Sequence, residues 1–567
     1  MEQLKVQGKR IVIVGGVAGG ASAAARARRL SESAQITLFE RGPHVSFANC
    51  GLPYYIGGEI EQSADLLLES PEKLAGRLKI DVRVLTEVVS IQPGDKTVTV
   101  RERNSGKTWV QPYDALLLSP GARPMRPPIP GIDRPGHFTL RNVPETLAVS
   151  DWIDTQGAER AVIVGGGYIG LEMAEQLVRR GLQVTVVEAA NQVMGVLDFE
   201  MAAMLREELM RHGVAVCLQD TVTGFEDSKL GESAVLASMV TLRSGKRIPA
   251  DLVVLGIGVR PEVTLAQSAG LEIGALGGIR VNEYLQTSDP SIWAVGDAIE
   301  VKHGVTGEWQ LIPLAGPANR QGRAAADNML GRSTPYSGTL GTGILRLFDL
   351  TAACTGATEK QLTRLQIPHH ILHLHPNSHA SYYPGAVTMA IKLLFAPITG
   401  KLLGAQAVGQ DGVDKRIDVI AAAVRAGLTV HHLADMELAY APPFGSAKDP
   451  VNLAGMIGEN ILNGDLKLIQ WHEISGLNLQ DTTLLDVRQP AELQEGMLPG
   501  AISIPLSELR ERLEDVPRGK DVVVYCRSGQ RSYYASRILT QNGFNCASLD
   551  GSYLTWSRAI KAQMAAV

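Results

Sequence analysis

Residues 161–188 read AVIVGGGYIGLEMAEQLVRRGLQVTVVE, and this stretch decides the fold that we predict. Its first run is β-branched and predicts a buried parallel strand, which three glycines follow in the G-x-G-x-x-G spacing, Gly165, Gly167 and Gly170. A helix-like segment and a second strand, which ends at Glu188, come next. Such glycines let the backbone approach a pyrophosphate at a helix N-terminus, and the acid accepts hydrogen bonds from a ribose. The stretch therefore predicts a dinucleotide-binding fold.

The same arrangement occurs earlier in the chain, over residues 10–40. The run RIVIV predicts a strand, ASAAARARRL a helix, and QITLFE a second strand that ends at Glu40. The loop departs from the G-x-G-x-x-G spacing because Val17 stands where a second glycine is expected. We predict a second dinucleotide site here, to which we assign Gly15, Gly16, Gly19, Gly20, Glu40 and Arg41.

The composition is typical of a large α/β protein. At 567 residues, the chain predicts three or four domains of about 150 residues each. Its apolar fraction of 45% and its 59 glycines indicate a folded protein with many glycine turns. A net charge of −5 argues against a nucleic-acid partner. The chain has no uninterrupted apolar run of about 18 residues, so we expect no membrane insertion.

Two features favour a cytoplasmic location. The five cysteines show no close pairing and no C-x-x-C, which fits a reducing compartment and provides no zinc site. Lys9, Arg10 and the following IVIVGGVAGGASAAA have the outline of a signal peptide. Four glycines interrupt its apolar core, however, and the dinucleotide loop explains them better, so we expect no secretion.

The acid at the end of the later fold predicts the preferred nicotinamide cofactor. A carboxylate at Glu188 favours a free 2′-hydroxyl on the ribose and repels a 2′-phosphate. The residues that follow directly, AANQVM, include no arginine that would neutralise a phosphate. We therefore expect NADH to be preferred, with NADPH as the alternative.

Further segments resemble the pyridine-nucleotide disulfide reductase superfamily over about residues 1–455. LLLSPGARP and LVVLGIGVRPE each read as a strand that enters a glycine turn, and SIWAVGDA resembles the flavin motif in which an aspartate, here Asp297, binds the ribityl chain. The resemblance implies an FAD domain that the NAD(P)H domain interrupts, followed by an α+β dimerisation domain. The implied ranges are 1–150 with 275–335 for FAD, 151–274 for NAD(P)H and 336–460 for dimerisation.

A single cysteine follows the first acid, in HVSFANCGLPYYIGG. A helix is expected to begin at Gly51–Leu52, which would place Cys50 at its N-terminus and lower the pKa of the thiol. Well-known members of the superfamily carry C-x-x-x-x-C here. One cysteine closes no internal disulfide, so the second sulfur comes from a substrate thiol, or oxygen chemistry forms a sulfenate.

The segment SFANCGLPYYIGG is very similar to that of the coenzyme A-disulfide reductases. This resemblance implies that Arg26, and with it Arg29, meets the phosphates of coenzyme A, with Ser46 and Asn49 as polar neighbours of the cysteine. It also implies a homodimer, in which Tyr440 of ELAYAPPFGSAKDPVN and a tyrosine of SYYPG reach the cysteine of the partner. We assign that second tyrosine to Tyr382, with Tyr383 as the alternative.

The run HHILHLHPNSH at residues 369–379 is rich in histidine. His373 and His375 alternate as on one face of a strand, but no carboxylate or cysteine accompanies them. We expect a half-exposed strand and no metal site.

The tail resembles the rhodanese domain, over about residues 470–567. Cys526 ends an apolar strand and is followed by RSGQRS and a helix, a loop whose N–H groups and arginines, Arg527 and Arg531, favour a thiolate or persulfide. The C-x4-R spacing suits a sulfane sulfur, whereas the C-x5-R loops of phosphatases are wide enough for a tetrahedral oxyanion. One departure is Met497, where the family has a histidine.

Together these features predict an α/β protein with two Rossmann-like nucleotide-binding domains, an α+β dimerisation domain and a C-terminal α/β rhodanese domain. We expect FAD-dependent reduction of coenzyme A disulfide, persulfide or polysulfide by NAD(P)H through Cys50, with sulfane sulfur delivered by Cys526. Direct transfer between the two cysteines and transfer through coenzyme A both stay open. The alternatives are an NADH oxidase or peroxidase with a cysteine sulfenate, and a redox sensor or sulfur carrier.

Overall fold

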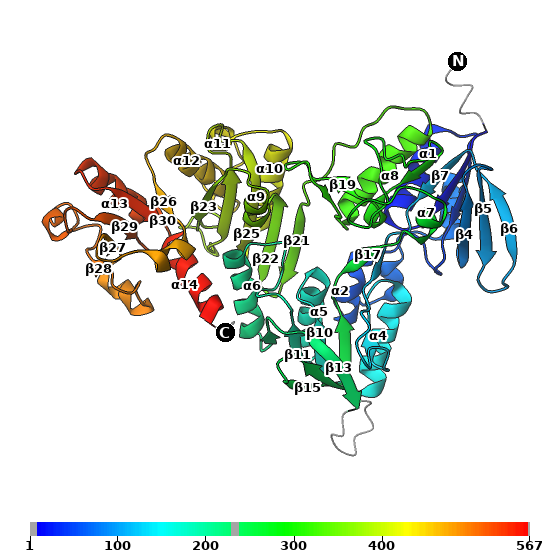
Figure 1. Cartoon of the computed structure of the whole chain (residues 1–567), viewed down its shortest axis with the longest axis horizontal. Helices are drawn as coiled ribbons and strands as arrows, with labels where there is room; N and C mark the ends of the chain where they lie inside the picture. The colour runs from blue at the N-terminus through cyan, green and yellow to red at the C-terminus, as the bar shows by residue number, and fades with distance from the viewer. Residues whose placement is uncertain (1–7, 228–237, 565–567) are drawn as a thin grey trace. The chain divides into compact units, whose positions relative to one another are not determined.

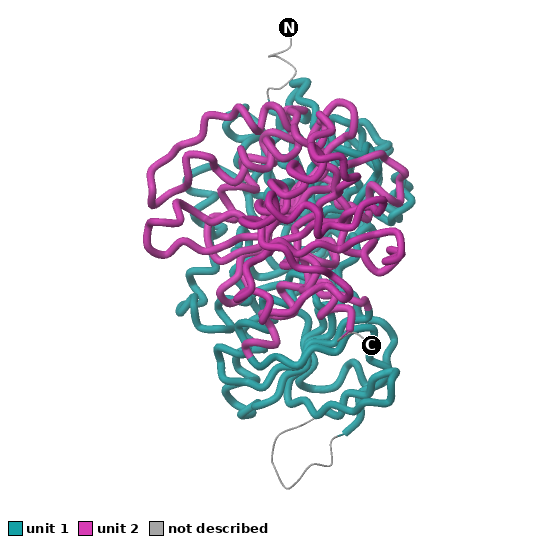
Figure 2. The backbone as a smooth tube through the Cα atoms, turned by 90° about the vertical axis from the view of Figure 1, so that its left-hand side faces the viewer, with its two compact units in different colours: residues 1–189, 213–341 teal, residues 190–212, 342–567 magenta. Residues whose placement is uncertain are grey.

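A computed structural model describes residues 8–227 and 238–564 of the chain (Figure 1). The chain forms two compact units (Figure 2). The first unit comprises residues 1–189 and 213–341, and the second comprises residues 190–212 and 342–567. Within the described ranges, no helix combines the length and apolar character that a membrane span requires.

The first sheet of the first unit has the strand order β18-β7-β1-β2-β3, and all of its strands are parallel. Its strands are β1 (Arg10–Val14), β2 (Gln35–Phe39), β3 (Asp81–Arg83), β7 (Ala115–Leu118) and β18 (Ile292–Ala294). Helices α1 (Ala18–Leu30) and α8 (Ala315–Met329) pack against each other beside it. Because β18 pairs with β7, this sheet joins chain from both sides of the second nucleotide fold.

The second sheet has the order β12-β11-β10-β16-β9 and is also parallel. Its strands are β9 (His137–Phe138), β10 (Arg160–Val164), β11 (Gln183–Val187), β12 (Ala215–Cys217) and β16 (Leu252–Leu255). Helix α5 (Tyr168–Arg179) connects β10 to β11, and β10 is buried along nearly its whole length. The predicted strand, glycine loop, helix and strand are therefore confirmed in both folds.

Short elements complete the first unit. The two glycine turns that leave the nucleotide sheets pair with each other, as antiparallel strands β8 (Ala122–Pro124) and β17 (Val259–Pro261). The remaining elements are α2 (Leu52–Ile56), α3 (Pro71–Leu78), α4 (Val143–Gln156), α7 (Thr264–Ser268), β4 (Thr86–Gln92), β5 (Thr97–Glu102), β6 (Thr108–Pro112), β13 (Val222–Asp227), β14 (Ser238–Leu242), β15 (Arg247–Ala250), β19 (Val301–Lys302) and β20 (Trp309–Gln310).

The second unit contains an antiparallel sheet of order β21-β22-β25-β24-β23. Its elements are β21 (Gly343–Leu347), β22 (Leu350–Gly356), β23 (His370–Leu374), β24 (Ala390–Phe395) and β25 (Leu402–Gly409), with α9 (Glu359–Arg364), α10 (Val413–Arg425), α11 (Val430–Asp435) and α12 (Pro450–Leu462). Helix α6 (Phe199–Arg211) also packs on this sheet, although it lies within the sequence range that we assigned to the NAD(P)H domain.

The C-terminal domain of the second unit is a parallel sheet of order β26-β30-β29-β27-β28. Its elements are β26 (Leu468–Ile469), β27 (Thr482–Asp486), β28 (Ile502–Ser503), β29 (Asp521–Tyr525), β30 (Cys546–Leu549), α13 (Gln530–Gln541) and α14 (Ser552–Met564). Helix α14 packs against α6, so the C-terminal domain lies against the antiparallel domain within this unit. The predicted fold class is confirmed.

Candidate active sites

The first glycine of each nucleotide loop has a backbone conformation that favours glycine. Gly15 has a φ of 95° and Gly165 a φ of 106°, both in the left-handed region. A Cβ atom on Gly15 would lie 2.0 Å from the carbonyl oxygen of Ser119, and one on Gly165 would lie 2.4 Å from that of Gly256. Each loop therefore begins with a glycine because it turns directly against the next strand of its sheet.

The last glycine of each loop brings the helix close to the loop. A Cβ atom on Gly20 would lie 1.8 Å from the oxygen of Gly15, and one on Gly170 would lie 2.0 Å from that of Gly165. The two loops thus share one register, in which Gly15 corresponds to Gly165 and Gly20 to Gly170. Val17 takes the position of the middle glycine in the first loop, as its sequence indicated.

The other glycines of the loops have different surroundings. A Cβ atom on Gly16 or Gly19 would lie 2.8 Å from the side chain of Val45 or Val295, respectively. At Gly167, by contrast, no atom of the described residues lies within 4 Å of such a Cβ. Protein packing therefore does not account for a glycine at this position, whereas the close approach of a ligand would.

Each predicted ribose-binding acid holds the turn of its own loop. Glu40 accepts hydrogen bonds from the N–H groups of Gly16, at 2.9 Å, and Gly42, at 2.7 Å. Glu188 accepts one from the N–H of Gly166, at 2.7 Å. Both carboxylates are thus fixed at the carboxyl end of the second strand, where the fold places a ribose. The neighbouring Arg41 lies 3.9 Å from Glu262.

The starts of the two helices fit a pyrophosphate. Neither α1 nor α5 has a side-chain cap at its N-terminus, so their first N–H groups face the glycine loops. Asp297 lies half-buried in the turn Gly296–Ala298 after β18, and burial raises the pKa of its carboxyl while Arg141 opposes this. These donors and acceptors fit the pyrophosphate and ribose of a dinucleotide in each fold, and the assignment of FAD to the first fold and a nicotinamide dinucleotide to the second stays a prediction.

Cys50 lies in a short 3-10 turn, Asn49–Gly51, directly before α2. The predicted helix start is confirmed, and this thiol is the exposed one among the five cysteines. The predicted lowering of its pKa is wrong. Desolvation by the surrounding protein, with the carboxylates of Glu172 and Asp297, raises the pKa of Cys50. The helix has only five residues, so its dipole does not offset these effects.

The residues assigned to coenzyme A lie around the first helix and the cysteine. Arg26 is held by Asp327 of α8, at 2.8 Å, whereas Arg29 on the next turn of α1 is exposed. The N–H of Ser46 donates to the oxygen of Gly16, and Asn49 is exposed beside the thiol. Their contact with coenzyme A stays a prediction.

Two of the three candidate tyrosines form a pair. The hydroxyls of Tyr382 and Tyr440 lie 3.0 Å apart, and both side chains are exposed, at 74% and 48%. Tyr383 is also exposed, but its ring packs edge-on against His379. The geometry favours Tyr382 over Tyr383 as the companion of Tyr440.

Cys526 lies between β29 and α13 in a pocket of polar groups. Its Sγ accepts the N–H of Gly529 at 3.1 Å and lies 3.7 and 3.8 Å from the hydroxyls of Ser532 and Ser552. Its own N–H donates to the Oγ of Ser552 at 3.2 Å. Only 1% of the residue is exposed. The thiol donates to the Ser532 hydroxyl, and the N–H of Gly529 is a donor that stabilises a charged sulfur at this position.

The arginine of the C-x4-R loop binds a carboxylate. Arg531 makes two hydrogen bonds to Glu492, at 2.6 and 2.7 Å, and this pairing lowers the pKa of Glu492 to about 2. Cys526 also contributes to the electrostatic surroundings of the Arg531 guanidinium. Arg531 therefore lies beside the sulfur site, but part of its charge is already neutralised by Glu492.

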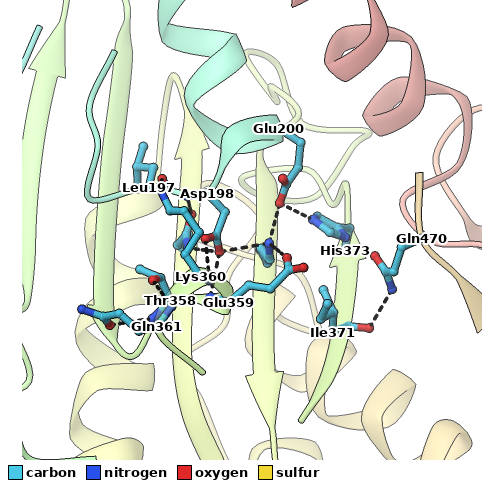
Figure 3. Close-up of polar contacts among 12 residues, drawn as sticks. Leu197, Asp198, Glu200, Thr358, Glu359, Lys360, Gln361, Ile371, His373 and Gln470 are labelled. Carbon is cyan, nitrogen blue, oxygen red and sulfur yellow. Dashed lines mark hydrogen bonds and ion pairs between the residues drawn. The ribbon is translucent and has the colours of Figure 1, made fainter. Parts of the chain in front are cut away.

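The structure places charged groups around His373 that the local sequence did not indicate. His373 is 6% exposed, so the prediction of a half-exposed strand is wrong at this residue. Its Nδ1 lies 2.6 Å from Asp550 and its Nε2 3.0 Å from Glu200 (Figure 3 shows the Glu200 contact). These partners stand 177 and 173 residues away in the chain, so no local sequence motif could predict them.

A buried lysine extends this cluster. The Nζ of Lys392 lies 2.5 Å from both Glu200 and Glu359 and 3.0 Å from Asp198. Burial opposes the charge, but the three carboxylates outweigh it and raise the pKa of Lys392 above its ordinary value. The three carboxylates lie close enough to hold a cation, and the ammonium group supplies that charge.

Three family models match the chain. Residues 9–322 match the pyridine nucleotide-disulphide oxidoreductase family. Residues 345–450 match its dimerisation domain, and residues 473–559 match the rhodanese-like domain.

Relatives and solved structures resemble the chain over most of its length. The coenzyme A disulfide reductase of Staphylococcus haemolyticus is 35% identical and covers 79% of this chain and 98% of that protein. The reduced CoADR-RHD of Bacillus anthracis has a TM-score of 0.94 and 50% identity, and the match covers 98% of both chains. A NAD-dependent persulfide reductase from A. fulgidus has a TM-score of 0.89 and 37% identity, covering 96% of this chain and 100% of that one.

Proposed function

Because the chain belongs to the pyridine nucleotide-disulphide oxidoreductase family, we propose that this oxidoreductase uses NADH and FAD to reduce coenzyme A disulfides or persulfides at Cys50. The observation that carries the proposal is the single exposed cysteine before α2, in the same domain as Asp297. Its rhodanese domain would supply sulfane sulfur through Cys526. The five free cysteines favour a location in the reducing cytoplasm.

The chemistry at Cys50 begins with thiol–disulfide exchange. The thiolate attacks a coenzyme A disulfide, forms a Cys50–S–S–coenzyme A bond and releases one coenzyme A thiolate. With a coenzyme A persulfide, attack on the inner sulfur forms the same mixed disulfide and releases hydrosulfide. A thiol with a raised pKa is the stronger nucleophile once it has lost its proton.

FAD, when bound, would accept a hydride from NADH and would supply the electron pair that splits the mixed disulfide. Cys50 then returns to the thiolate, and the second coenzyme A leaves as a thiol. In a homodimer, which the dimerisation domain favours, Tyr382 and Tyr440 of one subunit would supply a proton to that leaving thiolate.

The rhodanese domain would collect sulfur by the same exchange chemistry. The Cys526 thiolate attacks the outer sulfur of thiosulfate, forms a persulfide and releases sulfite. The N–H of Gly529 and the hydroxyls of Ser532 and Ser552 then stabilise the charged sulfur. The persulfide passes its outer sulfur to a thiolate acceptor, such as coenzyme A, which gives the substrate of Cys50.

Stoichiometry without oxygen tests the proposal as a whole. The purified protein should oxidise one NADH for each coenzyme A disulfide and release two thiols, which absorbance and a thiol reagent measure. An oxidase or peroxidase that works through a Cys50 sulfenate would instead consume NADH rapidly with oxygen or peroxide and slowly with the disulfide.

Glu188 predicts a preference between the two nicotinamide cofactors. NADH should give the larger kcat/KM, by roughly tenfold or more, because a 2′-phosphate would face the fixed carboxylate. Steady-state rates with NADH and NADPH measure this ratio. In Glu188→Gln the ratio should fall, because the amide keeps the size of the side chain but not its charge. A clear NADPH preference in the unchanged protein would contradict the assignment.

Replacing Gly167 tests whether this glycine is needed for dinucleotide binding or for the packing of the protein. Gly167→Ala should leave the melting temperature nearly unchanged, because the new Cβ meets no atom within 4 Å in the part of the chain that the structure describes. It should raise the KM for NADH severalfold, since the methyl group would lie where the pyrophosphate approaches the loop. The matched variant Gly165→Ala should instead lower the melting temperature, because Gly165 has a positive φ. An unchanged KM in Gly167→Ala would place the dinucleotide elsewhere.

A further inference from the structure

His373 of the antiparallel domain contacts the segment 550–552 of the rhodanese domain, whose Ser552 contacts Cys526. Its backbone N–H donates to one carboxylate oxygen of Asp550 at 2.8 Å, and its Nδ1 lies 2.6 Å from the other oxygen. Asp550 follows β30 in the rhodanese domain and is 2% exposed. This two-point contact is therefore shielded from water and fixes the direction of the Asp550 side chain.

Both ring nitrogens of His373 face carboxylates. The Nε2 atom lies 3.0 Å from Glu200 of α6, which also binds Lys392 of β24 at 2.5 Å. Burial disfavours the charged ring, but the carboxylates of Asp550 and Glu200 outweigh it and raise the pKa of His373 to about 9. At neutral pH the ring is an imidazolium that donates to both partners.

The segment held by His373 leads directly to the sulfur site. Asp550 stands two residues before Ser552, whose Oγ accepts the N–H of Cys526 at 3.2 Å and lies 3.8 Å from its Sγ. Between them, Gly551 has a φ of 61° and passes so close to His373 that a Cβ atom on it would lie 2.8 Å from the histidine Cβ. A shift of His373 would therefore be passed to the residues that contact the sulfur.

We propose that His373 is a positioning residue that holds the segment 550–552 in the place that Cys526 needs to accept sulfur. The antiparallel domain would thus complete a site that the rhodanese sequence alone does not contain. This inference rests on the proposed function, because it takes Cys526 as the residue that accepts sulfane sulfur. His373 itself would touch neither the sulfur nor its donor.

The charged neighbours define how the contact depends on pH. Glu200 of α6 contacts His373 and also binds Lys392, which is the cross-strand partner of His373 on β24, and Glu359 and Asp198 contact Lys392. Two residues after His373, His375 has its Nε2 2.9 Å from Thr555 of α14, and burial lowers its pKa to about 3, so it stays neutral.

The pKa of His373 is raised by folding. Its charged contacts are therefore complete below the ordinary histidine pKa of about 6.5 and are lost as the pH rises through about 9. The loading of Cys526 with sulfur should then decline over the same alkaline range.

The test measures the release of sulfite when the full-length holoenzyme reacts once with thiosulfate, without cyanide, between pH 7 and 10. At pH 7, His373→Gln should load sulfur roughly tenfold to a hundredfold more slowly than the unchanged protein. The unchanged protein should lose rate as the pH passes about 9, whereas His373→Gln should lack this decline. His370→Gln, on the same strand but with its ring against Phe395, is the matched control and should behave as the unchanged protein.

Asp550→Asn keeps the size of the side chain and removes the charge that faces His373. It should slow sulfur loading at pH 7 and move the alkaline decline to lower pH, because His373 loses a carboxylate partner. This second variant keeps the inference testable if His373→Gln folds poorly. A merely structural contact would change the melting temperature without moving the pH profile, and that result would overturn the proposal.

Cys526→Ser distinguishes the role of Cys526 as the sulfur acceptor from the role of His373 as the residue that positions its site. If it still releases sulfite at the full rate, Cys526 is not the acceptor and the proposed function of the domain fails. If it is inactive while His373→Gln and Asp550→Asn keep the rate and pH profile of the unchanged protein, only the positioning role of His373 fails.

Discussion

Replacement of Cys50 by serine is expected to abolish the reduction of coenzyme A disulfides and persulfides, by about a thousandfold or more. A hydroxyl does not attack a disulfide, and no second cysteine stands beside Cys50 in its segment. FAD should stay bound, because Cys50 is exposed and does not hold the nucleotide loops. Flavin reduction by NADH should also continue, since hydride transfer needs no thiol. Thiol release and the bleaching of flavin absorbance measure the two steps separately.

A control and a contrary result define this test. Cys217→Ser changes a half-buried cysteine beside Lys246 in the other nucleotide fold, and it should keep full disulfide reduction. If Cys50→Ser keeps full activity on persulfides, electrons leave the flavin by another route and the proposed mechanism is wrong.

Replacement of Cys526 by serine is expected to abolish sulfur transfer from thiosulfate while persulfide reduction continues. Gly529 and Ser552 would still form the anion pocket, but it would hold no nucleophile able to carry sulfur. Small persulfides are expected to reach Cys50 without the rhodanese domain and should therefore react at nearly the normal rate. Bulky or poorly soluble sulfur donors should no longer be used. Thiocyanate formation from thiosulfate and cyanide, and NADH oxidation with coenzyme A persulfide, measure the two activities.

The opposite outcome is equally informative. Equal loss on every substrate, at unchanged FAD content and melting temperature, would mean that sulfur always passes through Cys526 first. The two domains would then be obligatory steps of one pathway, and direct entry of persulfides at Cys50 would be wrong.

The sequence by itself determined the elements that rest on local patterns. The two nucleotide folds and the loop from Cys526 to Arg531 each combine a buried strand, turn residues and a helix within about 30 residues. The helix after Cys50 begins where its own local sequence indicated. Such signals are local because strand burial, helix starts and glycine conformations depend mainly on neighbouring residues. The family resemblance added the order of the domains, which the family models match.

Only the tertiary structure decided the electrostatics. The pKa of Cys50 rises because the surrounding protein desolvates the thiol and because Glu172 and Asp297, remote in sequence, lie near it, whereas the sequence showed only the start of a helix. The sequence assigned Arg26 to a phosphate of coenzyme A, and only the fold shows that its guanidinium also binds Asp327.

The surroundings of His373 could not be predicted from the sequence, since its local pattern is that of an ordinary half-exposed strand. Its two carboxylate partners come from segments more than 170 residues away on either side. Charge pairing in a buried site depends on distances of a few ångströms, which local periodicity does not encode and only the packing of domains creates.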